Sequence, residues 1–370
     1  MPVKYRNDQF PPKNIEWEKI AGPLEKASAA ISRYDSFLGI IPNPQIFVSP
    51  IMVQEAVSSS RIEGTRTTAG EVLAYEAGKT DIDPSRENDV REVVNYQAAV
   101  RLAVSMLNDI PLSGRVLRAA HEVLLQGVRG QLKSPGKYRH DQNWIGRSYN
   151  IEEARYIPIE PNKLEDAMAK WERYVNSDDH PALVKIAVAH AEFESIHPFS
   201  DGNGRIGRIV VPLMLCTEGL MSQPCFYLSE FFEHRNNDYQ DKLLAVSSDG
   251  DWTGWITFFL EALETQAAEN NLKARAVFEL FENTRRELSE VSNSPSAEKA
   301  VECLFKSPVF PANVFTKIDG VPEKTGRRLL NVMRDDMGIV KEIAPHSGQR
   351  AAVLVFPKLL EIVEGVKIQE

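Results

Sequence analysis

Apolar residues recur at intervals of three and four along most of the chain, a spacing that predicts a mainly helical protein. The expected helices cover residues 15–38, 49–63, 66–110, 112–126, 183–196, 203–220 and 252–290. Extended stretches are few and short, at residues 153–161, 339–344 and 351–356. We therefore expect a mainly α fold with one small β-hairpin and two further strands near the end of the sequence.

Two of these helices meet at a proline. The pattern over residues 183–196 stops before Pro198, and the residue that precedes a proline is disfavoured in the right-handed helical conformation. His197 should therefore lie on a loop at a helix end. The next helix, residues 203–220, is apolar almost all round, which is typical of a buried central helix.

The helix over residues 49–63 has clear start and stop signals. Ser49 can cap it, and Pro50 suits the first helical position. Gly64 is placed to end it, because glycine readily adopts the left-handed conformation found after helices.

The same pattern divides the chain. Residues 1–110 read as an N-terminal helical region and residues 111–288 as a central domain. Residues 289–296, rich in serine, read as a linker. Residues 297–370 carry three helical patterns and two strands, which favours a winged-helix-like module.

That module has a basic helix but little excess charge. The helix carries Lys324, Arg327 and Arg328, and residues 297–370 hold eleven basic and ten acidic side chains. Contact with DNA and a role in packing or partner choice both stay open.

Composition narrows the setting. The net charge of −9 and pI near 5.5 disfavour indiscriminate binding to nucleic acid or membrane. The three cysteines have no metal-binding spacing, which fits a reducing compartment. No signal peptide and no apolar run of about 18 residues is evident. We expect a cytoplasmic protein that does not bind membranes.

The richest chemistry lies in residues 197–208, the signature segment. His197 offers a base for proton removal, and Asp201 offers a carboxylate for a hard cation. Residues 202–204 can turn backbone N–H groups toward an anion at a helix start, beside two arginines, Arg205 and Arg208. The segment is therefore suited to handling phosphate.

Two other features lack the context that their usual functions need. Residues 202–207 match GxGxxG, but a helical pattern precedes them where a dinucleotide fold needs a strand. No phosphate-binding P-loop sequence is present. His121 stands alone on a mostly apolar helix and is expected to be a packing residue.

The signature segment resembles that of Fic-domain proteins, HxFx[D/E]GNGRxxR, at every fixed position. These proteins transfer AMP from ATP to protein hydroxyl groups. The resemblance implies that His197 is the general base and that Asp201 holds Mg²⁺. It also implies a helical Fic core whose ATP-binding residues are Gly202, Asn203, Gly204, Arg205, Ile206, Gly207 and Arg208, with the two arginines on the β- and γ-phosphates.

An upstream helix resembles the inhibitory helix of the same family, [S/T]xxxE[G/N]. Ser59, Glu63 and Gly64 fill its fixed places, and Ser59 and Glu63 share a helix face. A Glu63 carboxylate paired with Arg208 would occupy the guanidinium that the γ-phosphate needs. The resemblance therefore implies autoinhibition by Glu63.

Two more regions resemble parts of the Fic site. Residues 153–161 would be the flap that binds the target, with Ala154, Arg155, Tyr156 and Ile157 in contact with it. An open-edged strand there could take up a target segment by strand addition. Tyr239 and Gln240 stand where family members often have two tyrosines near the nucleobase.

These observations favour an adenylyltransferase that uses ATP and Mg²⁺ to modify a Ser, Thr or Tyr hydroxyl of target proteins and of itself. A nucleotide-sensing DNA-binding regulator and a bifunctional enzyme that also removes AMP stay open. The implied partners are ATP and a target protein. DNA contact through residues 297–370 and a homodimer are left open.

Overall fold

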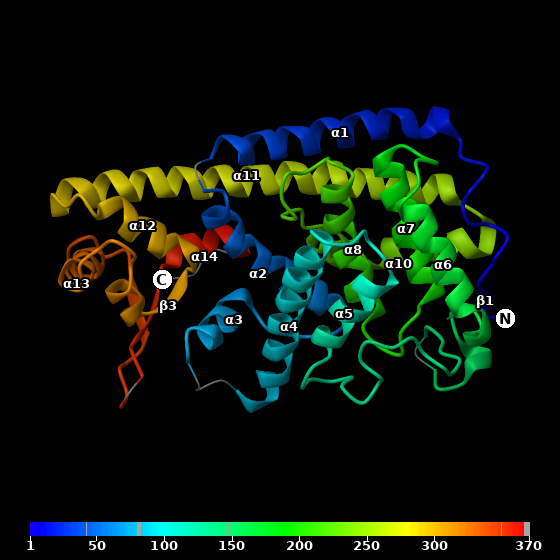
Figure 1. Cartoon of the computed structure of the whole chain (residues 1–370), viewed down its shortest axis with the longest axis horizontal. Coiled ribbons are helices and arrows are strands. Elements are labelled where there is room, and N and C mark those ends of the chain that lie inside the picture. The colour runs from blue at the N-terminus through cyan, green and yellow to red at the C-terminus, as the bar shows by residue number, and fades with distance from the viewer. Residues whose placement is uncertain (42, 80–82, 147, 349, 366–370) are drawn as a thin grey trace. The chain divides into compact units, whose positions relative to one another are not determined.

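The fold is mainly helical in a computed structural model that describes residues 1–370 except 42, 80–82, 147, 349 and 366–370 (Figure 1). This confirms the expected fold class. The α-helices are α1 (Trp17–Ile40), α2 (Gln45–Ile62), α3 (Ala69–Glu76), α4 (Pro84–Leu107), α5 (Gly114–Leu124), α6 (Leu164–Val175), α7 (Ala182–Ile196), α8 (Asn203–Thr217), α9 (Ser229–His234), α10 (Asn236–Asp249), α11 (Trp252–Ser292), α12 (Ala297–Lys306), α13 (Glu323–Asn331) and α14 (Pro357–Glu364).

The strands are short and form two small sheets. They are β1 (Val3–Lys4), β2 (Tyr156–Ile157), β3 (Val309–Pro311), β4 (Lys341–Ala344) and β5 (Val353–Val355). Single helical turns are η1 (Ile151–Glu153), η2 (Pro161–Lys163), η3 (Ala312–Thr316) and η4 (Val332–Asp336). Among the described residues, no helix is both long and apolar enough to cross a bilayer.

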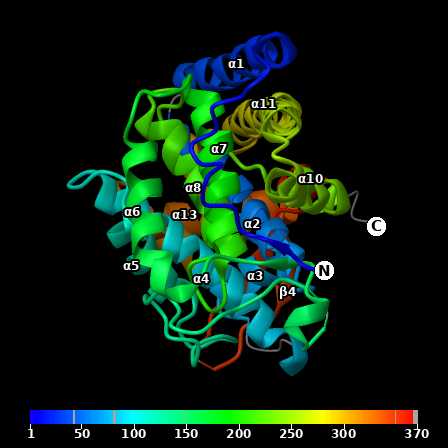
Figure 2. The ribbon, with the colours of Figure 1, turned by 90° about the vertical axis from the view of Figure 1, so that its right-hand side faces the viewer.

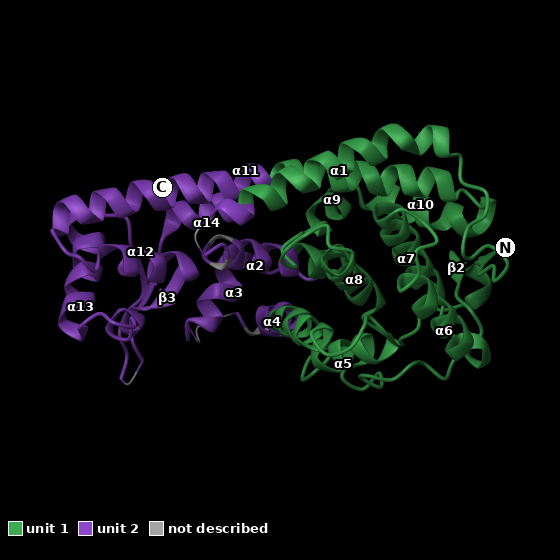
Figure 3. Ribbon diagram, turned by 45° about the horizontal axis from the view of Figure 1, so that its top comes forward, with its two compact units in different colours: residues 1–37, 58–64, 94–269 green, residues 38–57, 65–93, 270–370 purple. Residues whose placement is uncertain are grey.

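The chain forms two compact units (Figure 3). Unit 1 comprises residues 1–37, 58–64 and 94–269, and unit 2 comprises residues 38–57, 65–93 and 270–370. The predicted N-terminal region, residues 1–110, therefore contributes to both units. The signature segment and the end of α2 belong to unit 1.

The core of unit 1 is built around α7 and α8, which pack on each other, with α6 against α7 (Figure 2). Every residue of α7 from Leu183 to Ile196 is buried. Two tryptophans tie their indole N–H groups to α7 carbonyls: Trp255 donates to Ala187 at 2.7 Å and Trp171 to Ala189 at 2.8 Å. Because α7 is enclosed on all sides, its C-terminus is a rigid support for His197.

The start of α2 differs from the prediction. The helix begins at Gln45, so Ser49 and Pro50 lie inside it instead of at its N-terminus. Pro50 is the sixth residue of α2 and has no N–H, so the helix lacks one hydrogen bond, to the carbonyl four residues earlier. Gly64 has a φ of 101° and follows the end of α2, as predicted.

The strand of the predicted flap is not an open edge. On one side, Val3 and Tyr5 donate their N–H groups to the carbonyls of Arg155 and Ile157, so β1 pairs with β2 in parallel. On the other side, Ile145 and Tyr156 exchange backbone hydrogen bonds. An antiparallel bridge joins residues 145 and 156, so the expected hairpin is present in part, but the expectation that β2 is an open edge strand was wrong.

Unit 2 contains a three-stranded antiparallel sheet of order β3-β5-β4. The order α12, β3, η3, α13, β4, β5 is consistent with a winged helix, and β3 is a strand that the sequence pattern missed. The predicted linker, residues 289–296, begins inside α11, which continues to Ser292.

The basic side chains of α13 are exposed, and two of them have partners. Arg327 forms an ion pair with Glu323 at 2.5 Å, one helical turn away. Arg328 donates to the Ser292 carbonyl at 3.3 Å. Part of the predicted basic surface is therefore engaged within the chain itself.

Candidate functional site

His197 ends α7 in a left-handed conformation, with φ 51° and ψ 61°. Its backbone N–H still donates to the Phe193 carbonyl at 3.0 Å. The ring nitrogen Nδ1 lies 3.3 Å from the Glu194 carbonyl, so this nitrogen carries the proton and Nε2 keeps a lone pair. Burial lowers the pKa of His197 to about 4, which makes the imidazole neutral at pH 7. The predicted loop position at a helix end is confirmed.

Three side chains that are distant in sequence brace the loop after His197. His121 accepts the Gly136 N–H on Nδ1 and donates from Nε2 to the Asp201 carbonyl, both at 2.9 Å. Its ring stacks on Phe199 with centroids 3.8 Å apart. Burial lowers the pKa of His121 to about 4, in keeping with a neutral packing residue. His121 therefore has the structural role that the sequence predicted.

Arg139 and Asn143 brace the same loop from the segment before the flap. The Arg139 Nε donates to the His197 carbonyl at 3.0 Å, and its backbone N–H donates to the Pro198 carbonyl at 2.9 Å. The Asn143 amide donates to the Phe199 carbonyl at 3.2 Å. The sequence analysis missed both residues, because nothing in their local pattern shows that they reach a loop more than 50 positions away.

The N-terminus of α8 has no side-chain cap. Gly202, with φ 77°, is the N-cap, and as a glycine it offers no side-chain acceptor to the first N–H groups of the helix. The Asn203 side chain is used elsewhere: it closes the loop by accepting the Phe199 N–H at 2.7 Å and donating to the Phe199 carbonyl at 2.8 Å. The N–H groups at the start of a helix, at the positive end of its dipole, are suited to bind an anion.

Asp201 lies at the mouth of this helix end. Its Oδ1 accepts the Gly202 N–H at 2.6 Å and lies 3.6 Å from the buried Arg205 guanidinium. The described residues contain no cluster of three or more His, Cys, Asp or Glu side chains suited to a metal. One carboxylate still fits Mg²⁺, which usually keeps several waters and takes other ligands from substrate phosphates.

Arg208 is held by residues 59–63, at the C-terminal end of α2. Its Nη2 donates to Glu63 Oε1 at 2.7 Å and to the Ser59 carbonyl at 2.8 Å, and its Nε donates to Ser59 Oγ at 2.8 Å. Only 2% of the Arg208 side chain is exposed, against 35% for Glu63. Burial opposes ionisation of Glu63, but the Arg208 charge outweighs it and lowers the carboxyl pKa.

Gly204 allows this pair to form at the start of α8. A Cβ at Gly204 would overlap the Glu63 carboxylate and lie 2.9 Å from Arg208 Nη1. The first turn of α8 and the Glu63 carboxylate therefore meet in van der Waals contact, which only a residue without a side chain permits.

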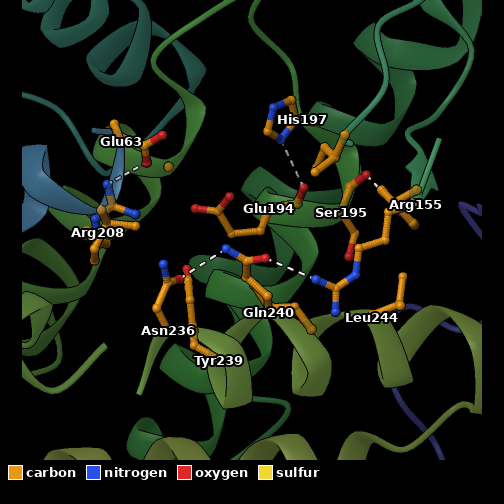
Figure 4. Close-up of a pocket in the computed structure, with 15 residues that line it drawn as sticks. Glu63, Arg155, Glu194, Ser195, His197, Arg208, Asn236, Tyr239, Gln240 and Leu244 are labelled. Atoms are coloured by element: carbon orange, nitrogen blue, oxygen red, sulfur yellow. Dashed lines mark hydrogen bonds and ion pairs between the residues drawn. The ribbon is translucent and has the colours of Figure 1, made fainter. Parts of the chain in front are cut away.

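A pocket of about 210 Å³ opens beside these residues (Figure 4). Small-molecule sites usually exceed about 300 Å³, and here Glu63 forms part of the wall. The lining residues come from all parts of unit 1: Ile62, Glu63, Ile145, Arg155, Tyr156, Glu194, Ser195, His197, Gly204, Arg208, Asn236, Tyr239, Gln240, Leu243 and Leu244.

The two predicted base-contacting residues line this pocket. Tyr239 is buried, and its hydroxyl donates to His190 Nε2 at 2.9 Å, while His190 Nδ1 donates to the Gly207 carbonyl at 3.0 Å. The Gln240 amide accepts from Arg155 Nη1 at 3.0 Å and donates to Asn236 at 3.1 Å. The lining also includes the apolar residues Leu243 and Leu244, from the same helix.

The remaining predicted site residues differ in position: some line the pocket and others are buried beside it. Ile206 is fully buried in the core, and Gly207 packs against Phe193 and Glu194. Among the flap residues, Arg155 and Tyr156 line the pocket, and the Tyr156 hydroxyl donates to the Ser195 carbonyl at 3.0 Å. Ala154 is buried, and Ile157 pairs with Lys4.

Two known protein families match parts of this chain. The description "Fic/DOC family N-terminal" matches residues 22–105, and "Fic/DOC family" matches residues 111–215. The second range contains His197 and the whole signature segment.

Curated relatives carry the name protein adenylyltransferase Fic. The one from Culex quinquefasciatus is 26% identical over 221 residues, and the one from Drosophila melanogaster is 24% identical over 215 residues. In each case the match covers 57% of this chain and 40% of the relative. The chain thus matches less than half the length of these relatives.

Solved structures share the fold. A Fic family protein from Desulfovibrio desulfuricans aligns with a TM-score of 0.59 and 21% identity over 95% of this chain and 98% of its own. Fic-1 from Caenorhabditis elegans aligns with a TM-score of 0.52 and 17% identity over 68% of this chain and 72% of its own. With two adjacent family regions and a complete signature segment, this chain belongs to the Fic/DOC family.

Proposed function

We propose that this protein transfers AMP from ATP to a hydroxyl group of proteins, including its own chain. The observation that carries the proposal is one of placement: a neutral imidazole, an uncapped helix N-terminus and a buried arginine all face one pocket. The names of the curated relatives support the same reaction class.

His197 would act as general base on the acceptor hydroxyl. Its Nδ1 is turned to the Glu194 carbonyl, which leaves Nε2 to take the proton. The hydroxyl oxygen then bonds to the α-phosphorus as the bond from that phosphorus to the bridging oxygen breaks, and pyrophosphate leaves. General base catalysis of this kind contributes about 10²- to 10⁴-fold to a rate.

The phosphates would lie over the start of α8. The first N–H groups of that helix and the Arg208 guanidinium would offset their negative charge. Arg205 lies near the same end of α8, where its guanidinium is 3.6 Å from the Asp201 carboxylate. Mg²⁺ held by Asp201 would neutralise charge on the phosphate oxygens.

Glu63 would keep this site inactive. In the present conformation, its carboxylate takes the Arg208 N–H that a γ-phosphate would need. It also narrows the pocket beside Gly204. ATP would therefore bind weakly or in an unproductive pose until the end of α2 moves.

The acceptor would be a Ser, Thr or Tyr side chain presented near the flap. A target segment can pair with β2 only if Val3 and Lys4 leave it. Ile145, on the opposite side of β2, lines the pocket and could contact the target without that change. The DNA-binding regulator and the AMP-removing enzyme remain predictions from the sequence.

Intact-mass analysis tests the proposal. The Glu63→Gly protein incubated with ATP and Mg²⁺ should gain the mass of one AMP or more. The double variant Glu63→Gly/His197→Ala should label at least about 10²-fold more slowly. Equal labelling of the two proteins would remove His197 from the reaction, and a mass gain other than AMP would change the donor chemistry.

A further inference from the structure

Glu194 is a buried acid that lines the pocket and has one carboxyl oxygen without a hydrogen-bond partner in the part of the chain that the structure describes. Only 9% of the residue is exposed, and its Oε1 has no hydrogen-bond partner among the described residues. The side chain lies between Arg208 and Ser195, with its carboxyl turned to the side where Arg208 and Glu63 lie (Figure 4). Leaving a buried polar atom unsatisfied in this way is destabilising, and a ligand that donates a hydrogen bond to it could recover that cost.

None of the described residues around Glu194 donates a hydrogen bond to its Oε1. Its Oε1 packs against Gly207, where a Cβ would overlap it. Arg208 is the nearest attracting charge, but its guanidinium donates to Glu63 and Ser59 instead. Burial raises the pKa of Glu194 to about 7, and the Glu63 charge adds to the rise.

A second glutamate on the same helix shows how a structural acid differs. Glu192 is also buried, and burial also raises its pKa to about 7. Its Oε1 accepts the Tyr5 hydroxyl at 2.6 Å, and it does not line the pocket. Glu192 is thus satisfied within the fold, whereas Glu194, two residues further along, lines the pocket with one carboxyl oxygen unsatisfied among the described residues.

We propose that Glu194 accepts hydrogen bonds from the ribose hydroxyls of the bound nucleotide and so selects ribonucleotides over deoxyribonucleotides. This rests on the proposed function, in which the phosphates lie near Arg208 and the base near Tyr239. In a nucleotide, the sugar connects these two groups, and Glu194 lines the same pocket as both residues.

The chemistry of the carboxyl narrows the choice of ligand group. The ionised carboxyl repels phosphate and can only accept hydrogen bonds, so a ligand group that donates is the better partner. A ribose offers two neighbouring hydroxyl donors, and acidic residues bind ribose hydroxyls in other nucleotide sites. The exocyclic amine of adenine is the rival donor, and a protein donor such as Arg208, after Glu63 has moved, is the other.

Competition between nucleotides tests the inference. The Glu63→Gly protein should label with ATP about 10- to 100-fold more efficiently, by kcat/KM, than with whichever of 2′-dATP and 3′-dATP lacks the bound hydroxyl. Adding Glu194→Ala should bring that ratio close to one, with Glu194→Gln between the two. The matched control Glu192→Gln should keep the ratio of the Glu63→Gly protein.

Three results would overturn the inference. Equal use of ATP and both deoxy forms by the Glu63→Gly protein would do so without any Glu194 variant. A Glu194→Ala change that alters labelling by every nucleotide equally would assign Glu194 to Arg208 or to packing. A change that instead relaxes the choice between ATP and purine riboside triphosphate, which lacks the amine, would assign it to the base.

Binding measurements separate this inference from the proposed reaction. Displacement of a fluorescent ATP analogue from the Glu63→Gly protein by ATP, 2′-dATP and 3′-dATP needs no turnover. If the protein labels nothing but binds ATP more tightly than a deoxy form in a Glu194-dependent way, AMP transfer fails and the ribose contact stands. If labelling occurs with no such preference in binding or rate, the ribose contact fails alone.

Discussion

Replacing Glu63 should release the activity that the wild-type protein withholds. Glu63→Gly removes the carboxylate that lies 2.7 Å from Arg208. At that separation, two unit charges attract by about 6 kcal/mol at an effective dielectric of about 20. Breaking such a buried pair typically changes a free energy by about 3–5 kcal/mol, because the remaining charge loses its partner.

Solvent reduces this figure here, since 35% of the Glu63 side chain is exposed. Taking about 3 kcal/mol, and a factor of ten for each 1.4 kcal/mol, the conformation with Arg208 available should become about 10²-fold more populated. At ATP concentrations below saturation, the initial rate of labelling should rise by a similar factor. Radiolabelled ATP gives that rate for the two proteins side by side.

A control separates the Glu63 carboxylate from general loosening of the same helix end. Arg61 and Glu233 form an ion pair at 3.0 Å that also holds the end of α2 but does not involve Arg208. Glu233→Gln should therefore label as slowly as wild type. Equal rates for Glu63→Gly and wild type would refute the account of inhibition, and equal release by Glu233→Gln would attribute it to helix mobility.

Further predictions concern pH, packing and the N-terminal strand. Because the pKa of Glu63 is lowered from its ordinary value of about 4.5, its carboxylate stays ionised at every pH above that value. Inhibition of the wild-type protein should therefore persist from pH 8 to pH 5 and be lost only at lower pH. Labelling rates relative to Glu63→Gly across this range check it. Because the pKa of Glu192 is raised from about 4.5 to about 7, ionisation of this carboxyl opposes folding as the pH rises through that range. The free energy of unfolding of Glu192→Gln relative to wild type, measured by urea denaturation, should therefore increase by up to about 3 kcal/mol between pH 4.5 and pH 8. A difference independent of pH would contradict this prediction. Gly204→Ala should lower the free energy of unfolding more in the wild-type protein than in Glu63→Gly, because the new methyl group overlaps the Glu63 carboxylate, and equal losses in urea denaturation would show that the pair tolerates it. Tyr5→Phe should lower the free energy of unfolding by about 1–3 kcal/mol through the loss of a partly buried hydrogen bond to Glu192, as equilibrium denaturation can measure; unaltered stability would mean that β1 is not anchored there.

The sequence predicted the parts of the site whose chemistry is local. His197 follows a helical pattern and precedes a proline, so its place at a helix end could be deduced from neighbouring residues alone. The anion site at the start of α8 could also be deduced, because Gly202 and the helix that follows are adjacent. The pairing of Glu63 with Arg208 spans 145 positions and was predicted only through a family resemblance.

The rest depended on contacts that local patterns do not encode. β1 is two residues long and pairs with a strand about 150 positions away, so no periodicity signals it. The start of α2 was misplaced because Ser49 and Pro50 match a helix start while the packed residues before them extend the helix. Glu194 resembles any polar residue of a helix, and its lack of a partner is visible only once α8 and α10 enclose it.

The most direct test of the central claim is a crystal structure of the Glu63→Gly protein with Mg²⁺ and a non-hydrolysable ATP analogue. We predict the triphosphate across the first turn of α8, with a phosphate oxygen on Arg208 and the α-phosphorus beside His197 Nε2. A nucleotide bound elsewhere, or a pocket that stays empty at saturating analogue although Glu63 is absent, would contradict the account.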